Sequence, residues 1–272
     1  MSPLMSREEG RRDAGRRFWD LVGGTIPPFP DAPSTKYYSE CERDLFERHF
    51  GNLRGKRLLK TDLWDEAKNT RILEWAAARR GAEAFGMDIS RPILDEARHR
   101  FQSNGVALRA VISDVRAIAF RDGEFDALYS MGTCEHTPQV LASIAECFRV
   151  LKPGGLAIVG VPNRWDVFLR PLLSALLQRL GLYAYGYEKS FGMAGLEAML
   201  RTAGFTVEAR TGILFMPGWL RMADLLLYVK CPGASFLMKP LIAPFGWLYR
   251  RSDLIKRQGY LIACVVRKPG VA

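Results

Sequence analysis

The stretch AEAFGMDISRPILDEARHRFQSNG, residues 82–105, contains one complete strand and helix unit. Apolar residues dominate it up to Asp88, a pattern typical of a buried strand. Pro92 follows in the first turn of the next helix, where its missing backbone N–H has no cost. The stretch therefore predicts a βα unit whose strand ends at an acidic residue.

Similar units lie on both sides of this one. Strands are expected at 57–63, 82–90, 106–115, 125–131 and 156–163, and the helices between them at 67–81, 91–105 and 138–155, the last ending in a Pro-Gly-Gly turn. Strands that alternate with helices of this length form parallel βαβ units with right-handed crossovers. We therefore expect an α/β, Rossmann-like, doubly wound and mainly parallel sheet, which binds ligands beyond the carboxyl ends of its strands.

The two ends of the chain depart from this rhythm. A helix at 191–205 precedes strands at 206–215 and 259–269, which predicts seven strands with an antiparallel last strand. Residues 165–188 and 216–258 are apolar insertions that we interpret as a helical cap or lid, called the cap below. Residues 1–35 are expected to form a basic N-terminal arm and a Pro-rich linker without regular structure. An amphipathic helix is expected to follow at 35–53.

Composition excludes several classes of protein. Five scattered cysteines without a Cys-x-x-Cys pair argue against a disulfide framework or a zinc ribbon, and three dispersed histidines indicate no metal site. The N-terminus does not resemble a secretory signal, and no run of about 18 apolar residues predicts a membrane-spanning helix. We expect a cytoplasmic protein. Its net charge of +10 suggests an anionic partner, which can be a nucleic acid, a lipid surface or a phosphorylated substrate.

Three aspartates lie at the ends of the first three expected strands, namely Asp62, Asp88 and Asp114. A carboxylate at the end of the second strand can accept hydrogen bonds from both hydroxyls of an adenosine ribose. One strand further on, Asp114 can accept from the exocyclic amine of an adenine, with Val115 against the ring. Because aspartate is also common at helix N-caps, Asp88 can alternatively be only a cap for the helix after it.

Three segments of the chain resemble the class I S-adenosylmethionine-dependent methyltransferases. They are AFGMDIS (84–90), SDVRAIAFRDGEFDALYSMGTCEHTP (113–138) and ECFRVLKPGGLAIVGVPN (146–163), and they are most similar to the branch that methylates small molecules, quinols and lipids. The resemblance implies a methyltransferase domain over residues 36–272, with S-adenosylmethionine as cofactor. It also implies that Asp88 and Ile89 bind the ribose, that Asp114 and Val115 frame the adenine, and that Ser130, Met131 and Gly132 line the methionine part.

The first motif of that family, an acidic residue followed by glycines, is missing here. The aligned positions hold Lys60, Thr61, Asp62, Leu63 and Trp64. In one account the loop takes another path, Asp62 or Asp65 pairs with the ammonium of the cofactor, and Thr61 offers its hydroxyl. In the other, Lys60 and Trp64 fill the pocket and the chain is a degenerate scaffold. We favour the first account, because the adenosine half of the site is intact and KTDLWDEA is rich in hydrogen-bonding groups.

Methyl transfer depends mainly on placing the acceptor atom in line with the methyl group, and a hydroxyl acceptor also needs a general base. His136 in GTCEHTP lies just past the fourth expected strand, and quinol and lipid methyltransferases have a similar Glu-His pair there. We therefore expect His136 to be the base and Glu135 to orient it or to bind the acceptor. Alternatively, His136 caps or packs against the following helix.

These features predict an enzyme that methylates a small, partly apolar or lipid-linked acceptor, most simply on oxygen. The cap, with Leu172, Leu173, Leu176, Leu177 and Leu180 on one stripe, is either a lid packed on the sheet or an element that contacts a membrane surface peripherally. The alternatives are a catalytically degenerate subunit and a nucleic-acid methyltransferase. Nucleic acid is disfavoured because the basic residues are spread among apolar ones rather than gathered in a basic domain.

Overall fold

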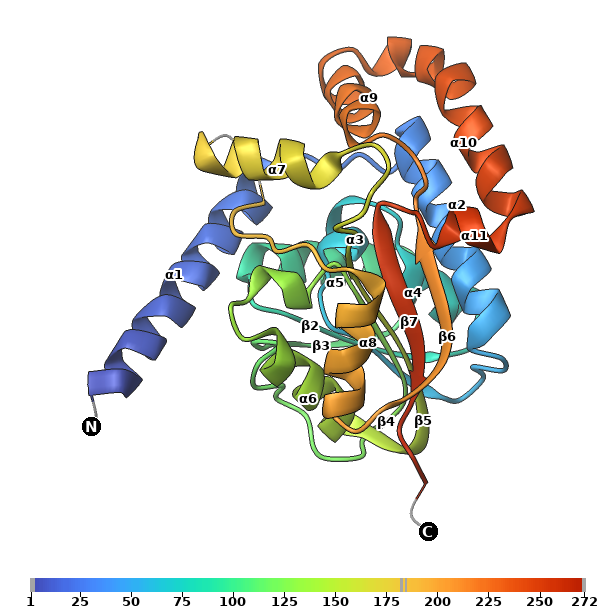
Figure 1. The fold of residues 1–272 in the computed structure, drawn as a ribbon. Helices are drawn as coiled ribbons and strands as arrows, with labels where there is room; N and C mark the ends of the chain where they lie inside the picture. Colours follow the sequence, from blue (N-terminus) through green and yellow to red (C-terminus); the bar gives the residue numbers. More distant parts are fainter. Residues whose placement is uncertain (1–2, 182, 184, 271–272) are drawn as a thin grey trace.

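A computed structural model describes residues 3–181, 183 and 185–270, and Figure 1 shows an α/β fold around one sheet. The strands are β1 (Arg57–Lys60), β2 (Glu83–Asp88), β3 (Leu108–Ile112), β4 (Phe125–Met131), β5 (Leu151–Pro162), β6 (Thr206–Ile213) and β7 (Leu261–Arg267). Their order is β3-β2-β1-β4-β5-β7-β6. Strand β7 alone runs in the direction opposite to the other six strands. The predicted seven-stranded, mainly parallel sheet with an antiparallel last strand is confirmed.

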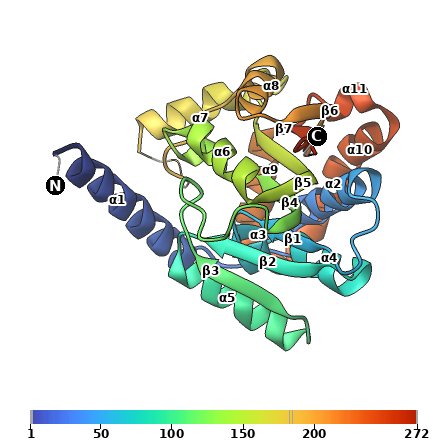
Figure 2. The ribbon, with the colours of Figure 1, turned by 90° about the horizontal axis from the view of Figure 1, so that it is seen from below.

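Two helical layers cover the sheet (Figure 2). One contains α2 (Pro33–His49), α4 (Ile72–Arg80) and α5 (Arg91–Ser103), and the other contains α6 (Val140–Val150) and α8 (Met193–Thr202). Neighbouring strand residues serve opposite layers: Leu58 packs with the first layer and Leu59 with the second, as the period of two in a strand requires. Because both faces of the sheet are covered, the middle residues of its central strands, such as Leu58, Leu128 and Ile158, are apolar and fully buried.

The arginine-rich N-terminal arm is a helix, and this helix includes the first residues of the segment 23–34, whose glycines and prolines predicted irregular chain. Helix α1 (Pro3–Thr25) continues through Gly23 and Gly24. Gly23 lies against Ile93 of α5, so closely that an added Cβ would be 2.6 Å from Ile93 Cγ1. Asp20 Oδ1 also accepts the first backbone N–H of α5 at 2.9 Å. The contact with α5 thus requires a small residue at position 23 and outweighs the low helix propensity of glycine.

The helix expected at 67–81 is two helices, α3 (Trp64–Lys68) and α4. The carboxylate of Glu66 accepts the backbone N–H groups of Leu73 and Glu74, at 2.9 and 3.2 Å, near the start of α4. Arg71 between the helices has a φ of 57°. A side-chain cap from the preceding helix therefore starts α4 anew, and periodicity alone does not reveal such a cap.

The Pro-Gly-Gly turn lies inside β5 and not at the end of a helix. Helix α6 ends at Val150 and β5 begins at Leu151. The pairing of β5 with β4 moves from Phe125–Leu151 to Ala127–Leu156, so residues 152–155 bulge out of the strand. The bulge absorbs residues that the sequence assigned to a helix terminus.

The cap contributes α7 (Arg170–Arg179), α9 (Gly218–Lys230), the short 3₁₀ helix η2 (Pro232–Met238), α10 (Lys239–Arg251) and α11 (Asp253–Lys256). Figure 1 shows α7, α9 and α10 together at the end of the sheet opposite the C-terminus. Leu220 of α9 and Tyr249 of α10 are buried in the core, as a lid packed on the domain requires. On α7, however, Leu172 and Leu176 are 67% and 54% exposed. The lid interpretation therefore fits α9 and α10 but not the leucine stripe of α7.

Candidate active site

A cavity of about 410 Å³ lies beyond the carboxyl ends of β1 to β4. Ten of the residues predicted from sequence line it: Thr61, Asp62, Asp88, Ile89, Asp114, Val115, Met131, Gly132, Glu135 and His136. Lys60 and Ser130 lie behind this wall, fully buried. The opposite wall comes from α1, α2 and the cap, and includes Trp19, Tyr38, Arg170, Tyr185 and Arg221. The topology thus gathers the strand-end residues, and the cap closes a space of the size of a small-molecule site.

The loop between β1 and α3 needs no glycine, because none of residues 61–63 has a positive φ. Close approach occurs instead in the neighbouring strand β2. The side chain of Leu63 lies on Gly86, where an added Cβ would be 2.5 Å from Leu63 Cδ2. Gly86 therefore gives the loop the room that glycines within a loop give elsewhere.

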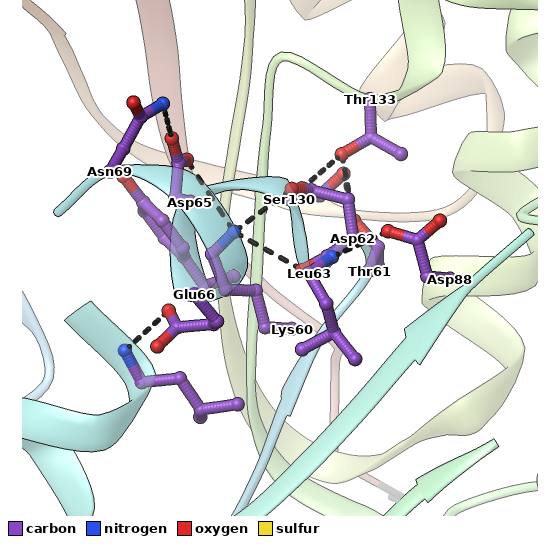
Figure 3. A network of polar contacts seen from close by, with 12 residues as sticks. Lys60, Thr61, Asp62, Leu63, Asp65, Glu66, Asn69, Asp88, Ser130 and Thr133 are labelled. Carbon is purple, nitrogen blue, oxygen red and sulfur yellow. Dashed lines mark hydrogen bonds and ion pairs between the residues drawn. The ribbon is translucent and has the colours of Figure 1, made fainter. Parts of the chain in front are cut away.

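Lys60 holds this loop from below (Figure 3). Its ammonium lies 3.0 Å from Asp62 Oδ1 and 3.5 Å from Asp65 Oδ2, and it donates to the Asp62 carbonyl at 3.1 Å. The Lys60 side chain is 1% exposed. Burial alone would lower its pKa, but Asp62 and Asp65 raise the pKa above its ordinary value, so the group stays charged. The buried cation thus fixes two carboxylates that face the cavity.

Hydroxyl groups complete the network. Thr61 Oγ1 donates to Ser130 Oγ at 2.8 Å, and Thr133 Oγ1 donates to Asp62 Oδ2 at 2.7 Å. These bonds join the loop to the end of β4 (Figure 3). The Thr61 hydroxyl thus donates within the protein, while its oxygen can still accept a hydrogen bond, so the predicted cofactor contact stays a prediction.

Asp88 lies at the end of β2, where a ribose contact was predicted. Its Oδ2 accepts the N–H of Leu63 and its Oδ1 accepts the N–H of Ser90, both at 2.8 Å. The N-cap of α5 is Ser90, so Asp88 is not that helix's N-cap residue. Burial raises the pKa of Asp88 to about 7, although both N–H groups oppose this. Each oxygen keeps a second lone pair that can accept from a ligand hydroxyl.

Asp114 is engaged by a neighbour that the sequence analysis missed. Arg116 Nη2 lies 2.6 Å from Asp114 Oδ2, and Arg116 Nε lies 3.0 Å from Asp114 Oδ1. Both residues line the cavity. An adenine amine at Asp114 would therefore share the carboxylate with Arg116. The only sign of this ion pair in the sequence is that the two residues are two positions apart.

His136 belongs to a short 3₁₀ helix, η1 (Cys134–His136). Its Nδ1 lies 2.8 Å from the carbonyl oxygen of Tyr187, and its ring packs edge-on against Trp19, with centroids 5.0 Å apart. Because a carbonyl only accepts, Nδ1 carries the hydrogen in this bond, and the lone pair of the neutral ring is on Nε2. Burial lowers the pKa of His136, so the ring is neutral at pH 7.

Glu135 does not orient this ring. Its Oε1 lies 3.9 Å from His136 Nε2, beyond hydrogen-bond distance, and its buried Oε2 has no partner among the described residues. Burial, and then the charge of Glu188, raise the pKa of Glu135 well above its ordinary value. The raised pKa favours the neutral form of Glu135, which can donate a hydrogen bond, and contact with the acceptor stays a prediction for this residue.

The cap wall carries a charged cluster that no sequence pattern indicated. Arg170 Nη2 donates to Glu188 Oε2 at 2.8 Å and to the Tyr183 hydroxyl at 3.0 Å. The Arg170 guanidinium lies over the Tyr260 ring, 3.9 Å from its centre. Arg170, Tyr183 and Glu188 lie in the insertion 165–188, and Tyr260 lies just before β7, so only the folded structure brings the ring and the guanidinium together. Within the described parts of the chain, no cluster of three potential metal-ligating side chains occurs.

We expect Lys60→Met to destabilise the protein by about 3–5 kcal/mol, because the buried carboxylate of Asp65 and the partly buried carboxylate of Asp62 would lose their cation. Urea denaturation followed by circular dichroism measures this change. Lys56→Met, four residues earlier and exposed, is the matched control and should change stability by about 0.5 kcal/mol or less. Equal stabilities of the two variants would contradict the structural role given to Lys60.

Comparison with known proteins agrees with this geometry. A family described as "Methyltransferase domain" matches residues 68–159. The ubiquinone biosynthesis O-methyltransferase of Thiobacillus denitrificans is 33% identical over 150 residues, which cover 54% of this chain and 65% of that protein, just under two thirds of its length. The enzyme of the same name from Xanthomonas euvesicatoria pv. vesicatoria is 28% identical over 228 residues, covering 82% of this chain and 90% of that protein.

A solved structure shares the fold over most of both chains. The [4+2]-cyclase SpnF has a TM-score of 0.60 at 17% identity, covering 94% of this chain and 93% of that chain. This likeness concerns the fold alone. The domain match identifies a methyltransferase domain at residues 68–159, and the named relatives agree with the resemblance of this chain to the class I S-adenosylmethionine-dependent methyltransferases.

Proposed function

We propose that this protein transfers a methyl group from S-adenosylmethionine to a hydroxyl oxygen of a small, partly apolar acceptor. The observation that carries the proposal is the single cavity in which Asp88 and Asp114 lie with His136 and the tyrosines of the cap. The relatives named ubiquinone biosynthesis O-methyltransferases support oxygen as the methylated atom and a lipid-linked acceptor.

The residues present fit the cofactor. Asp88 offers a carboxylate with free lone pairs at the end of β2. After β4, the backbone turns at Gly132, which has a φ of 76° and lines the cavity. Asp62 and Asp65 offer negative charge on the side where the glycine motif would lie. When bound, the cofactor would supply an activated methyl group. The chain's own residues would hold its ribose at Asp88 and its adenine near Asp114 and Val115.

His136 is the proposed general base. With Nδ1 bound to the Tyr187 carbonyl, Nε2 is the atom that can take a proton from the acceptor hydroxyl. Glu135 would donate a hydrogen bond to the acceptor. Trp19 and the aromatic cap wall would exclude water from this end of the cavity, since they cover the imidazole.

The alternative of a degenerate scaffold rested on Lys60 and Trp64 filling the pocket. Lys60 lies behind the wall, and Trp64 forms part of the wall, packed edge-on against Tyr185 with centroids 5.8 Å apart. An open cavity is what a working site requires, so this placement supports the enzyme.

We expect Asp88→Asn to weaken binding of S-adenosylhomocysteine by about 10- to 100-fold, since a charged hydrogen-bond acceptor is lost. His136→Gln should leave that affinity nearly unchanged and lower kcat by about 10²–10⁴. Calorimetric titration gives the affinities, and transfer of labelled methyl to a phenol carrying an isoprenoid chain gives kcat. A general base must be unprotonated, and burial lowers the pKa of His136. The kcat/KM of the wild type should therefore fall only at acidic pH, where His136 becomes protonated. If His136→Gln weakens cofactor binding as strongly as Asp88→Asn, the division of roles is wrong.

We also propose that the cap contacts a lipid surface. All exposed large hydrophobic side chains of the described residues except Leu21, Ile112 and Leu141 lie in the cap, where Trp219, Leu226, Leu241 and Trp247 join the α7 stripe. The same part of the chain contains the exposed cations Lys230, Lys239, Arg250, Arg251 and Arg257. Apolar groups beside cations are typical of elements that lie in a membrane interface. In the parts of the chain that the structure describes, no helix is long and apolar enough to cross a membrane.

Two further cations of the cap are not available to lipid head groups. Arg221 is 9% exposed and lines the cavity, and Lys256 is 3% exposed and bonds to Asp44 at 2.8 Å. The proposed lipid contact therefore depends on the remaining exposed cations and on the apolar stripe.

We expect the wild type to float with vesicles of phosphatidylcholine and phosphatidylglycerol. The triple variant Leu172→Ser, Leu176→Ser, Leu180→Ser should bind them at least about 10-fold more weakly, because it removes apolar surface that would enter the lipid. Leu141→Ser on α6, a position 43% exposed and outside the cap, is the matched control and should bind as the wild type does. Absence of wild-type binding to these vesicles would contradict the proposed contact.

A further inference from the structure

Three arginines of the described chain line the cavity, and two of them are paired with carboxylates. Arg116 pairs with Asp114 and Arg170 with Glu188. Arg221 has no Asp or Glu oxygen of the described residues within 4.0 Å, although it is only 9% exposed. A buried guanidinium without a counter-charge is costly, so this position favours an anionic ligand.

The contacts of Arg221 within the protein are weak. Its Nη1 donates to the carbonyl of Ser34 at 3.4 Å, near the limit for a hydrogen bond, and its guanidinium lies over the Tyr38 ring, 5.1 Å from the centre. The planar donor fork of an arginine matches a carboxylate in a bidentate pair. Most of this donor capacity is not used by the protein.

An acidic group faces the same part of the cavity. Asp65 lines it too; burial raises the pKa of Asp65 above its ordinary value, and the positive charges of Lys60 and Arg221 oppose that rise. Tyr38 is likewise within the electrostatic reach of both Asp65 and Arg221. A positive and a negative side chain thus lie near one another on the wall, beside the loop that replaces the glycine motif.

We infer that Arg221 binds the α-carboxylate at the amino-acid end of the cofactor, while Asp62 and Asp65 receive its α-ammonium. This inference rests on the proposed function and identifies how the glycine-free site recognises that end. A zwitterion matches a wall that carries an unpaired guanidinium beside two carboxylates. Arg221 lies in the cap, 160 residues after the loop that it complements.

A purely structural role for Arg221 would be to fasten α9 to the start of α2. Asp224, one turn further along α9, serves that purpose as well, since its Oδ2 accepts the N–H of Ser34 at 2.7 Å. Asp224 is fully buried and does not line the cavity. Asp224→Asn is therefore a matched control, because it loosens the same junction without touching the ligand site.

The test compares two ligands of the full-length protein by calorimetric titration. S-adenosylhomocysteine has the amino-acid end, and 5′-methylthioadenosine keeps the nucleoside and the sulfur but lacks that end. We expect Arg221→Met to weaken binding of S-adenosylhomocysteine by about 10- to 100-fold and to leave binding of 5′-methylthioadenosine unchanged. Arg221→Lys should give an intermediate loss for the first ligand only, and Asp224→Asn should leave the ratio of the two affinities as in the wild type.

The possible results separate this inference from the function on which it rests. An unchanged affinity ratio in Arg221→Met overturns the inference, whether both ligands weaken together, as for a structural residue, or neither does, as for an arginine that binds an anionic acceptor. If Arg221→Met does not fold, the same criterion applies to Arg221→Lys. If the wild type binds neither ligand, the proposed function itself fails.

Discussion

The buried ammonium of Lys60 is the constraint on which the site depends. It lies beneath the loop between β1 and α3 and holds Asp62 and Asp65 in place at the cavity wall. A glycine-rich loop approaches a ligand with its backbone, whereas this loop presents carboxylates fixed by a cation from behind. The side chain of Leu63 can pack directly on the neighbouring strand because Gly86 there has no side chain. The glycine-free loop is therefore accommodated by Lys60 of β1 and Gly86 of β2.

The cap completes what the sheet begins. It contributes Arg170, Arg221 and several tyrosines to the cavity, and its outer face carries most of the exposed apolar side chains. Under the proposed function, a lipid-linked acceptor would meet the exposed apolar side chains of the cap and the cavity that the cap lines. SpnF, named a cyclase, shares this fold, so the fold does not by itself select a reaction. The residues of the cavity must do so.

The sheet and the strand-end aspartates could be predicted because they follow from local patterns. Apolar runs that end at Asp88 and Asp114 identify parallel strands, and parallel strands bring their carboxyl ends to one edge. Features that depend on contacts between distant segments could not be predicted. Gly23 belongs to a helix whose contact with Ile93 leaves no room for a side chain. That Arg221 lines the cavity without a paired carboxylate among the described residues is visible only in the folded structure. A single sequence also gives no sign that Lys60 points behind the wall.

The most direct test of the substitute loop is a crystal structure of the protein with S-adenosylhomocysteine bound. We expect the ribose hydroxyls to bind Asp88. The Lys60 ammonium should still lie within about 3.5 Å of Asp62 and Asp65, as it does without ligand. The amino-acid end should lie between these carboxylates and Arg221. A loop that moves away from Gly86 to admit the ligand, or a ligand bound outside this cavity, would contradict the account.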